Sequence, residues 1–342
     1  MIRVFEGIFD PNFSYFSGLN AELFPGSFLI LNKKKKPLLV TSSLERDNAM
    51  VRSRRLRGIR GFEREKQLLE ILGENLHGKR IGLNFSLYPV NSLKRLKKNF
   101  GAKKFVDVSA ALGKTRETKT KEEIKKIKNA VRISEECLLH FPDILKKALN
   151  EKEAELEINH SLFRNGAEAL AFPTIVASGK SAATIHHAPS NKKIKKGELV
   201  LVDFGAKANS YCSDLTRMFC RGTPNERQQK LFETVAETKK AAESLIKPKT
   251  KGFEVFNAAE EFLKEKGFVL QHGLGHGLGA ETHDFPDGFR KKSKTILAPR
   301  MVLTMEPGIY GSFGGIRLED DLVVTENGFK FLSKPQKELI RI

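Results

Sequence analysis

The stretch LVLVDFGAKANSYCSDLTRMF, residues 199–219, decides the fold of the second half of this chain. It contains two apolar runs, 199–204 and 211–219, and each is typical of a β-strand. The short connection between them predicts a β-hairpin. Each run also contains an acid, Asp203 in the first and Asp214 in the second. A carboxylate inside a buried strand is costly unless something neutralises it.

A second hairpin of the same kind is expected from MVLTMEPGIY, residues 301–310, and IRLEDDLVV, residues 316–324. Glu306 follows five largely apolar residues, and Glu319 stands among Ile, Leu and Val. The two hairpins therefore resemble one another in arrangement, with one acid in each strand.

Hairpin geometry predicts that these acids meet in pairs, because directly opposed residues of an antiparallel hairpin share a face. If residues 208–209 form the first turn, Asp203 stands opposite Asp214. If residues 312–313 form the second turn, Glu306 stands opposite Glu319. Like charges about 5 Å apart destabilise a sheet. A divalent cation between them removes that cost.

A fifth ligand is expected in HGLGHGLG, residues 272–279, where His276 has glycine on both sides. The glycines let the backbone approach an ion and remove side chains that would crowd it. Four carboxylates and one imidazole form an oxygen-dominated set, which suits manganese, cobalt or iron(II) better than a thiolate-type zinc site. Zinc remains open on affinity grounds.

Each of these residues also has a purely structural alternative. Asp203 would cap its hairpin turn, Asp214 would pair with Arg217, and Glu319 would pair with Arg317. The glycine-rich segment would then be a flexible loop. We prefer the metal site because two matched carboxylate pairs and a framed histidine fit together.

The remaining sequence predicts two domains, since 342 residues exceed the usual size of one. Residues 1–115 read as a small α/β domain and residues 116–342 as an α+β domain. In the first, strands are expected at 4–9, 28–32, 37–42, 80–85 and 103–109, and helices at 61–75 and 92–101. In the second, helices are expected at 121–141, 150–163, 223–246 and 252–267, the third capped by Thr223 and the last closed by Gly267.

The composition indicates a water-soluble protein with an excess of positive charge. Hydrophobic residues make up 40% and charged residues 30%, and no apolar run is long enough to span a membrane. We found no secretion signal, so the expected location is the cytoplasm. The three cysteines, Cys137, Cys212 and Cys220, lack C-x-x-C spacing and are expected to be free thiols.

The net charge of +19 raises the question of nucleic-acid binding. The lysine clusters at 33–36 and 192–196 adjoin strand-like runs and carry no interleaved aromatic residues of a single-strand binding platform. We therefore expect solvated turns and no nucleic-acid partner. Enrichment in Lys and Glu at high temperature is one cause of such a charge.

These motifs resemble those of the pita-bread metallopeptidases, the family of methionine aminopeptidase, aminopeptidase P and prolidase (Xaa-Pro dipeptidase). The resemblance covers nearly the whole chain. Its strongest elements are LVDFG (201–205), SDLTR (213–217), GHGLG (275–279), MEPG (305–308) and IRLEDD (316–321). It implies an α+β pita-bread catalytic domain at 116–342, preceded by a smaller α/β creatinase/prolidase-type domain at 1–115 with the motif NFSYFSG (12–18).

Carried over residue by residue, the resemblance implies two divalent metal ions per subunit. The implied ligands are those of the hairpin argument: Asp203, Asp214, His276, Glu306 and Glu319. Asp214 and Glu319 would touch both ions, and Glu306 would also act in catalysis.

The resemblance also implies residues on the substrate side. His186, assigned by its spacing to Pro189, and His283 match catalytic positions. His272 and Arg317 match substrate-binding positions of the proline-specific members, and His187, beside His186, is expected to bind the substrate as well. One departure is Pro173, where relatives usually have an acid, which affects the expected loop geometry.

The creatinase-type domain favours Xaa-Pro peptides as substrates. An Xaa-Pro dipeptidase is our first expectation, and an Xaa-Pro aminopeptidase (aminopeptidase P) is the alternative. An alternative of another class is a basic peptide- or nucleic-acid-binding protein on a peptidase scaffold. The resemblance suggests a homodimer, a proline-containing di- or oligopeptide as substrate, and no membrane partner.

Overall fold

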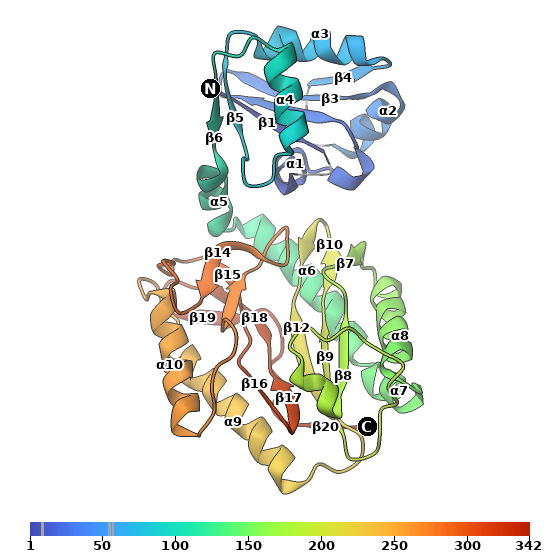
Figure 1. Cartoon of the computed structure of the whole chain (residues 1–342), viewed down its shortest axis with the longest axis vertical. Helices are drawn as coiled ribbons and strands as arrows, with labels where there is room; N and C mark the ends of the chain where they lie inside the picture. Colours follow the sequence, from blue (N-terminus) through green and yellow to red (C-terminus); the bar gives the residue numbers. More distant parts are fainter. Residues whose placement is uncertain (8–9, 54–55, 57) are drawn as a thin grey trace. The chain divides into compact units, whose positions relative to one another are not determined.

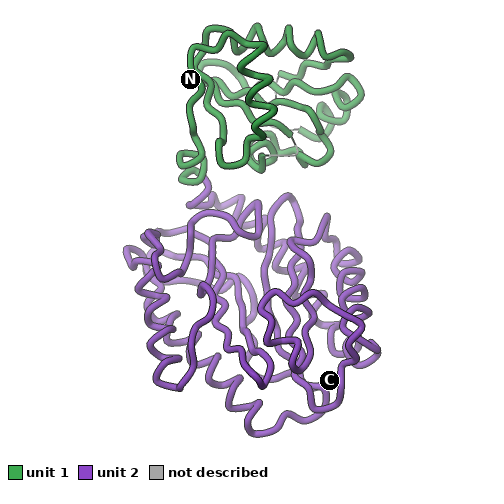
Figure 2. The backbone as a smooth tube through the Cα atoms, in the orientation of Figure 1, with its two compact units in different colours: residues 1–115 green, residues 116–342 purple. Residues whose placement is uncertain are grey.

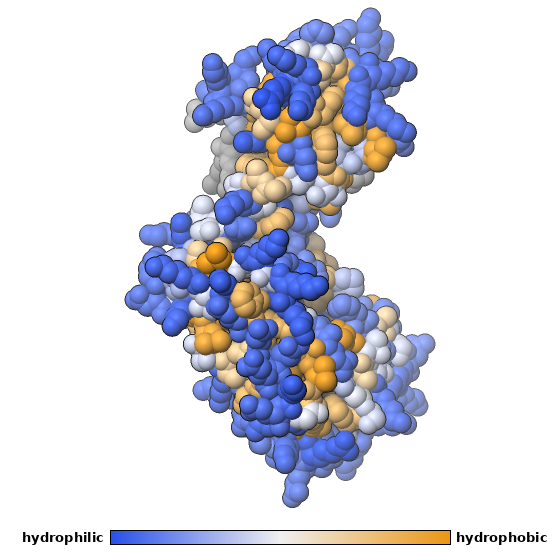
Figure 3. Space-filling view, turned by 60° about the vertical axis from the view of Figure 1, so that its left-hand side comes forward, coloured by the Kyte–Doolittle hydropathy of each residue, from blue (hydrophilic) through white to orange (hydrophobic). Residues whose placement is uncertain are grey.

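The computed structural model describes residues 1–7, 10–53, 56 and 58–342, which form two compact units, Met1–Thr115 and Arg116–Ile342 (Figure 2). Hydrophilic residues cover much of the face that Figure 3 displays, with hydrophobic residues in smaller patches. Among the described residues, no helix is both long and apolar enough to cross a membrane.

The first unit is built on one six-stranded sheet with the strand order β4-β3-β2-β1-β5-β6 (Figure 1). Its strands are β1 (Ile2–Glu6), β2 (Phe28–Asn32), β3 (Lys35–Ser42), β4 (Gly58–Phe62), β5 (Arg80–Leu83) and β6 (Lys104–Asp107). Its helices are α1 (Pro11–Ser17), η1 (Ala21–Leu23), α2 (Ser43–Arg52), α3 (Glu65–Leu76) and α4 (Val90–Asn99), and α5 (Ser109–Glu117) spans the boundary between the two units in the sequence.

Apolar residues line both faces of this sheet. In β2, Phe28 and Ile30 belong to a core shared with α3 and α4, whereas Leu29 belongs to a core shared with α1, α2 and α5. The alternation follows from the two-residue period of a strand. The strand expected at 4–9 corresponds to β1, and its last residues, 8–9, lie outside the described residues.

The second unit contains several smaller sheets with helices packed against them (Figure 1). Its helices are α6 (Lys121–Leu138), α7 (Phe141–Lys147), α8 (Glu151–Arg164), η2 (Gly179–Ala183), α9 (Glu226–Glu243) and α10 (Gly252–Glu265). Its strands are β7 (Ala169–Leu170), β8 (Ile175–Ser178), β9 (Leu199–Phe204), β10 (Ala206–Ala208), β11 (Tyr211–Cys212), β12 (Leu215–Cys220), β13 (Gly275–Gly277), β14 (Asp284–Phe289), β15 (Val302–Met305), β16 (Gly308–Gly311), β17 (Gly314–Arg317), β18 (Asp320–Val324), β19 (Phe329–Phe331) and β20 (Ile340–Arg341).

Several helix boundaries differ from expectation. The helix expected at 61–75 begins at Glu65, because Gly61 and Phe62 are the last residues of strand β4. The N-cap of α9 is Asn225, whose side chain accepts a hydrogen bond from the amide of Gln228. The predicted N-cap at Thr223 was therefore wrong by two residues. Asn225 and Gln228 complete a capping box. The helix expected at 121–141 ends at Leu138, and α7 starts at Phe141 with Pro142 in its first turn. Proline lacks an amide proton and is tolerated only at a helix start.

Strand β9 lies between two hydrophobic cores. Leu199 and Leu201 pack in a core with α9 and α10, whereas Val200 and Val202 pack in a core with α6, α7 and α8. Asp203 continues the alternation on the side of Leu201. The burial of this strand on both faces is therefore confirmed, and it places a carboxylate at the strand's end.

The first hairpin has a different register from the one predicted. Asp203 pairs with Thr216, not with Asp214, and the turn lies at Asn209 and Ser210, not at 208–209. Both turn residues have positive φ, 52° and 63°, as a tight two-residue hairpin turn requires. The register differs by two residues, an even shift, so Asp203 and Asp214 remain on one face.

The second hairpin has the predicted register. Gly311 pairs with Gly314, so the tip is at residues 312–313. Met305 pairs with Asp320, and Gly308 pairs with Arg317. Glu306 and Glu319 therefore face each other between these two paired regions.

Candidate metal centre and substrate site

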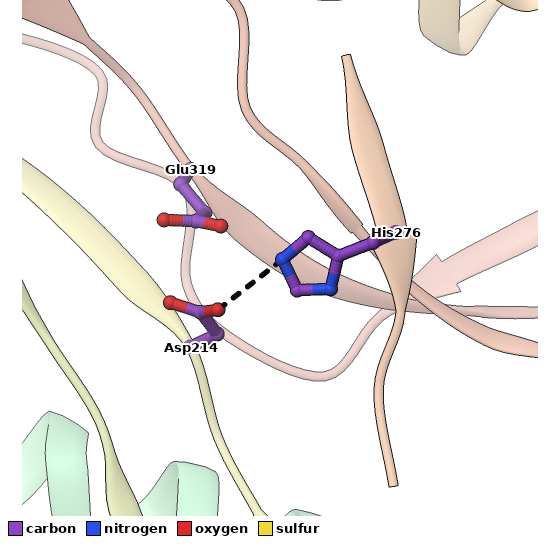
Figure 4. Close-up of side chains that lie close together, drawn as sticks. All are labelled: Asp214, His276 and Glu319. Carbon is purple, nitrogen blue, oxygen red and sulfur yellow. Dashed lines mark ion pairs between the residues drawn. The ribbon is translucent and has the colours of Figure 1, made fainter. Parts of the chain in front are cut away.

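Three of the expected ligands converge from three different parts of the fold (Figure 4). Asp214 lies between β11 and β12, His276 lies in β13, and Glu319 lies between β17 and β18. One ligand atom of each lies within 4.8 Å of the others. Such a cluster of two carboxylates and an imidazole is the kind of donor set that holds a divalent cation.

Glu306 adjoins this group. Its Oε1 lies 3.5 Å from Nε2 of His276, and Oδ2 of Asp214 lies 3.5 Å from the same nitrogen. The amide of Glu306 donates to the carbonyl of Leu274 at 2.9 Å, which fixes the start of the second hairpin beside the glycine-rich segment.

The glycines around His276 are required by close packing of β13. A Cβ atom at Gly275 would lie 2.1 Å from the carbonyl oxygen of Thr304. A Cβ atom at Gly277 would lie 2.4 Å from the backbone of Phe285 and Pro286. The glycines therefore let β13 fit between β14 and β15, which carries the imidazole to the carboxylates.

Asp203 reaches the site from the end of β9. Its Oδ2 accepts a hydrogen bond from Nη2 of Arg317, while its Oδ1 is buried and has no hydrogen-bond partner among the described residues. Burial raises the pKa of Asp203, Arg317 opposes that effect, and the charge of Glu306 adds to it. A buried oxygen with no donor is costly, and a cation would satisfy it.

Asp214 and Glu319 are also destabilised as charged groups by burial and by neighbouring acids. Burial raises the pKa of Asp214 well above its ordinary value, and the neighbouring Asp203 and Asp321 raise it further. Burial likewise raises the pKa of Glu319, with Asp214 and Glu306 as the next causes. Carboxylates packed together away from water need positive charge, so the residues present fit divalent cations.

Buried polar residues behind the centre hold Glu319 in place. The hydroxyl of Thr216 donates to Oε2 of Glu319 at 2.7 Å, and Arg217 donates to the backbone carbonyl of Glu319 at 2.5 Å. Arg217 also pairs with Asp320 at 2.9 Å. The structural alternative in which Arg217 pairs with Asp214 is therefore not the arrangement seen.

Arg317 lies among the ligands, and its ion pair is formed with Asp203. Besides Asp203, it donates from Nε to Thr216 at 3.1 Å and from Nη1 to the hydroxyl of Tyr310 at 2.9 Å. Burial lowers the pKa of Arg317. Nearby negative groups, Asp203 first among them, outweigh burial and raise that pKa well above its usual value. Arg317 therefore stays charged and links both hairpins.

His272 contacts the same network from the glycine-rich segment. Its Nε2 lies 2.8 Å from the hydroxyl of Tyr310, and its Nδ1 lies 3.9 Å from Oε2 of Glu306. Burial is the main cause that lowers its pKa. Sequence reasoning missed Tyr310 and Thr216, because each looks like an ordinary strand residue.

The other three histidines that the sequence predicts for the site differ in their surroundings. His283 is exposed, and its ring centroid lies 4.2 Å from that of His276. His186 is exposed as well. His187 is directed elsewhere, because its Nε2 lies 2.8 Å from Oε2 of the buried Glu151.

Buried carboxylates on two hairpins, with a histidine from a glycine-rich segment, in a chain that also contains a separate α/β unit, are the features of a two-domain metallopeptidase. The chain belongs to metallopeptidase family M24, whose model matches residues 125–326. The model of the creatinase/prolidase N-terminal domain matches residues 8–118. The pita-bread fold expected from the sequence is confirmed by these matches and by the solved structures that resemble it.

Several relatives resemble the chain over nearly its full length. It is 33% identical to the Xaa-Pro dipeptidase of Pyrococcus furiosus over 96% of this chain and 92% of that protein. The prolidase structure from Pyrococcus furiosus superposes with a TM-score of 0.86 at 32% identity and covers 98% of this chain and 96% of its own. An X-Pro aminopeptidase structure from Thermotoga maritima superposes with a TM-score of 0.91 at 28% identity. The match covers 100% of this chain and 97% of that structure's chain.

Proposed function

We propose that the chain is an Xaa-Pro dipeptidase that uses two divalent metal ions held by Asp203, Asp214, His276, Glu306 and Glu319. The observation that carries the proposal is the likeness to the Xaa-Pro dipeptidase of Pyrococcus furiosus over 92% of that protein's length. That share includes both units, and the acid cluster of the second unit supports metal-dependent chemistry.

The metal ions and the protein would divide the chemistry. Asp203, Asp214, His276, Glu306 and Glu319 would hold the ions, which would make hydroxide available near neutral pH by lowering the pKa of water. Manganese or cobalt suits the donor set best, with zinc or iron(II) as alternatives. Glu306, which lies beside His276, accepts a proton from the attacking water and delivers it to the leaving nitrogen of proline.

The surrounding histidines and Arg317 would bind and orient the peptide. His283, beside His276, and His186 donate hydrogen bonds to the carbonyl oxygen as negative charge develops on it. His272 and Arg317 share the hydroxyl of Tyr310 and face the same site, so they hold the proline end of the substrate.

A second candidate is an Xaa-Pro aminopeptidase. It is favoured by the TM-score of 0.91 with the X-Pro aminopeptidase structure from Thermotoga maritima. The two functions differ in what lies beyond the proline: a dipeptidase closes that space, and an aminopeptidase leaves it open.

The experiment compares a dipeptide with a tripeptide. Metal-free protein is supplied with Mn²⁺, Co²⁺ or Zn²⁺ and tested on Ala-Pro and on Arg-Pro-Pro. Cleavage of Ala-Pro alone supports the dipeptidase. Preferred cleavage of Arg-Pro-Pro supports the aminopeptidase. Cleavage of neither with any metal would refute both.

The net charge of +19 calls for a test of whether the chain is a binding protein for nucleic acid or acidic peptides. If the chain were a basic binding protein on a peptidase scaffold, it would bind RNA or an acidic peptide in a salt-sensitive way and take up no metal. We propose instead that the charge has no nucleic-acid partner. Gel-shift assays at low and moderate salt, with the metal-loaded protein, distinguish these cases.

We also propose a cytoplasmic homodimer. The three cysteines are buried free thiols, as is usual in a reducing compartment. The dimer is suggested by the family resemblance alone. Light scattering of the purified chain and fractionation of the source cells test the two parts separately.

A further inference from the structure

A buried carboxylate outside the metal centre has no part in the chemistry described above. Glu151 is the first residue of α8 and has no exposed surface. Its Oε1 accepts from the amide and the hydroxyl of Ser178, each at 2.8 Å. Its Oε2 lies 2.8 Å from Nε2 of His187, and it accepts from the amide and the hydroxyl of Ser190 at 3.3 and 2.9 Å.

These contacts keep the carboxylate charged. Burial acts to raise the pKa of Glu151, but the hydrogen bonds from His187, Ser178 and Ser190 outweigh it, and the pKa is lowered. A fully satisfied buried carboxylate fixes its donors in position, because any displaced donor would leave a costly unpaired group.

The donors lie at the two ends of one segment, residues 178–190. The start of α8 adds two further bonds, since the amide of Glu151 donates to the carbonyl of Lys192 and that of Lys152 to the carbonyl of Ser190. The segment is thus closed on the N-terminus of α8. It carries η2 and, directly before His187, the exposed His186.

The same segment touches the second hairpin. Arg317 donates from Nη1 to the carbonyl of Ile185 at 3.4 Å. A Cβ atom at Gly314 would lie 2.4 Å from the carbonyl oxygen of Gly179, and one at Gly315 would lie 1.9 Å from that of Ala182. Because η2 lies directly on β17, a shift of the segment would reach the arginine that binds Asp203.

We propose that Glu151 and His187 form a buried tie that positions residues 178–190 for the reaction. His187 is then a positioning residue, and the substrate-binding role expected for it from the sequence is replaced. His186 on the same segment keeps its place toward the substrate. The inference rests on the proposed function, because the positioned groups, His186 and Arg317, serve that reaction.

The first test is a pair of substitutions at His187. His187→Leu removes the bond to Glu151, and we expect kcat/KM on Ala-Pro with Mn²⁺ to fall about 10- to 100-fold. The loss should lie mainly in kcat, with metal content unchanged. His187→Gln has an amide that can donate to the same oxygen, so it should stay within about threefold of wild type.

A matched control is His160→Leu, which removes an exposed histidine of α8 and should leave kcat/KM at the wild-type value. Two results would overturn the tie. If His187→Gln lost as much as His187→Leu, the imidazole itself would be needed at the substrate. If His187→Leu matched wild type, the bond to Glu151 would have no consequence for the reaction.

The second test does not depend on activity. We expect the backbone amides of Ser178 and Ser190 to exchange with deuterium about tenfold faster or more in His187→Leu and Glu151→Gln. Exchange in α6 should be unchanged, which shows that the fold is intact. Glu157→Gln, at an exposed position of α8, is the control.

Exchange at wild-type rates in both variants would refute the tie. If the wild-type protein cleaves no Xaa-Pro peptide, the proposed function fails, whereas the exchange experiment still decides whether Glu151 and His187 hold the segment.

Discussion

Arg317 donates through Nη2 to Oδ2 of Asp203, and the other oxygen of that carboxylate, Oδ1, is buried with no hydrogen-bond partner in the part of the chain that the structure describes. One oxygen is neutralised by the guanidinium, while the second remains available to a cation. The remaining nitrogens of Arg317 hold Thr216 and Tyr310, so the charge that balances Asp203 also joins the two hairpins.

The first prediction concerns this pair. Arg317→Met leaves the Asp203 charge buried without its partner, and breaking a buried ion pair in this way costs about 3 to 5 kcal/mol. We expect that loss in the metal-free protein and a smaller loss with Mn²⁺, because a bound cation also neutralises Asp203. Urea unfolding with EDTA and with Mn²⁺ measures the difference.

Arg290→Met is the control, since that arginine has a side chain 56% exposed and pairs with another exposed residue. Its unfolding free energy should change little in either condition. An Arg317→Met variant that lost the same free energy with and without metal would show that Asp203 does not share its charge with a cation.

The second prediction concerns Asp214, which lies within reach of His276 and Glu319. Asp214→Asn should weaken metal binding by more than the about 10- to 100-fold that is typical of losing an outer-shell partner, because a direct ligand is lost. Hydrolysis of Ala-Pro should fall with it. Metal analysis after dialysis measures the stoichiometry, and Asp143→Asn, at an exposed position of α7, is the control. Full metal content in Asp214→Asn would remove this residue from the centre.

The third prediction separates His283 from the ligands. His283→Ala should lower kcat about 100-fold, as expected when one donor to a developing oxyanion is lost. Metal content should not change, since the ring of His283 lies beside His276 without belonging to the ligand cluster. His140→Ala, which removes an exposed histidine before α7, controls for general effects. An unchanged kcat would exclude His283 from the reaction.

The fourth prediction concerns metal and stability. The buried acids repel one another in the metal-free protein, so a bound cation should stabilise the folded state. A ligand that binds only the folded state adds about 2.7 kcal/mol at 100 times its Kd. The thermal unfolding midpoint should therefore rise with the Mn²⁺ concentration, and Asp214→Asn should abolish the rise. A midpoint independent of Mn²⁺ would contradict the metal centre.

The register of the second hairpin was predictable because the pattern of apolar residues in its strands and the position of its turn indicate the same pairing. The tip at residues 312–313 lies in a glycine-rich loop, and the even-numbered connection places Glu306 opposite Glu319. The first hairpin shows the limit of the same reasoning. Its turn uses positive φ at both Asn209 and Ser210, and serine gives no strong signal for that conformation.

The contacts that were not predicted are long-range. Glu151 and His187 are 36 residues apart in the chain, and Arg317 and Asp203 are 114 apart. Periodicity and turn signals describe neighbours in sequence, so they place each residue on an element without naming its partner. The spacing to Pro189 already distinguished His186 from His187, but the contact of His187 with Glu151 was unknown until the packing of α8 against residues 178–190 was seen.

The most direct measurement is the titration of metal-free protein with Mn²⁺ while Ala-Pro hydrolysis and bound metal are followed together, with Asp214→Asn alongside. The account predicts no hydrolysis without metal, activity that rises until two ions are bound per chain, and an inactive Asp214→Asn variant. Undiminished hydrolysis in the presence of excess chelator, or two ions bound without any cleavage of Ala-Pro, would contradict it.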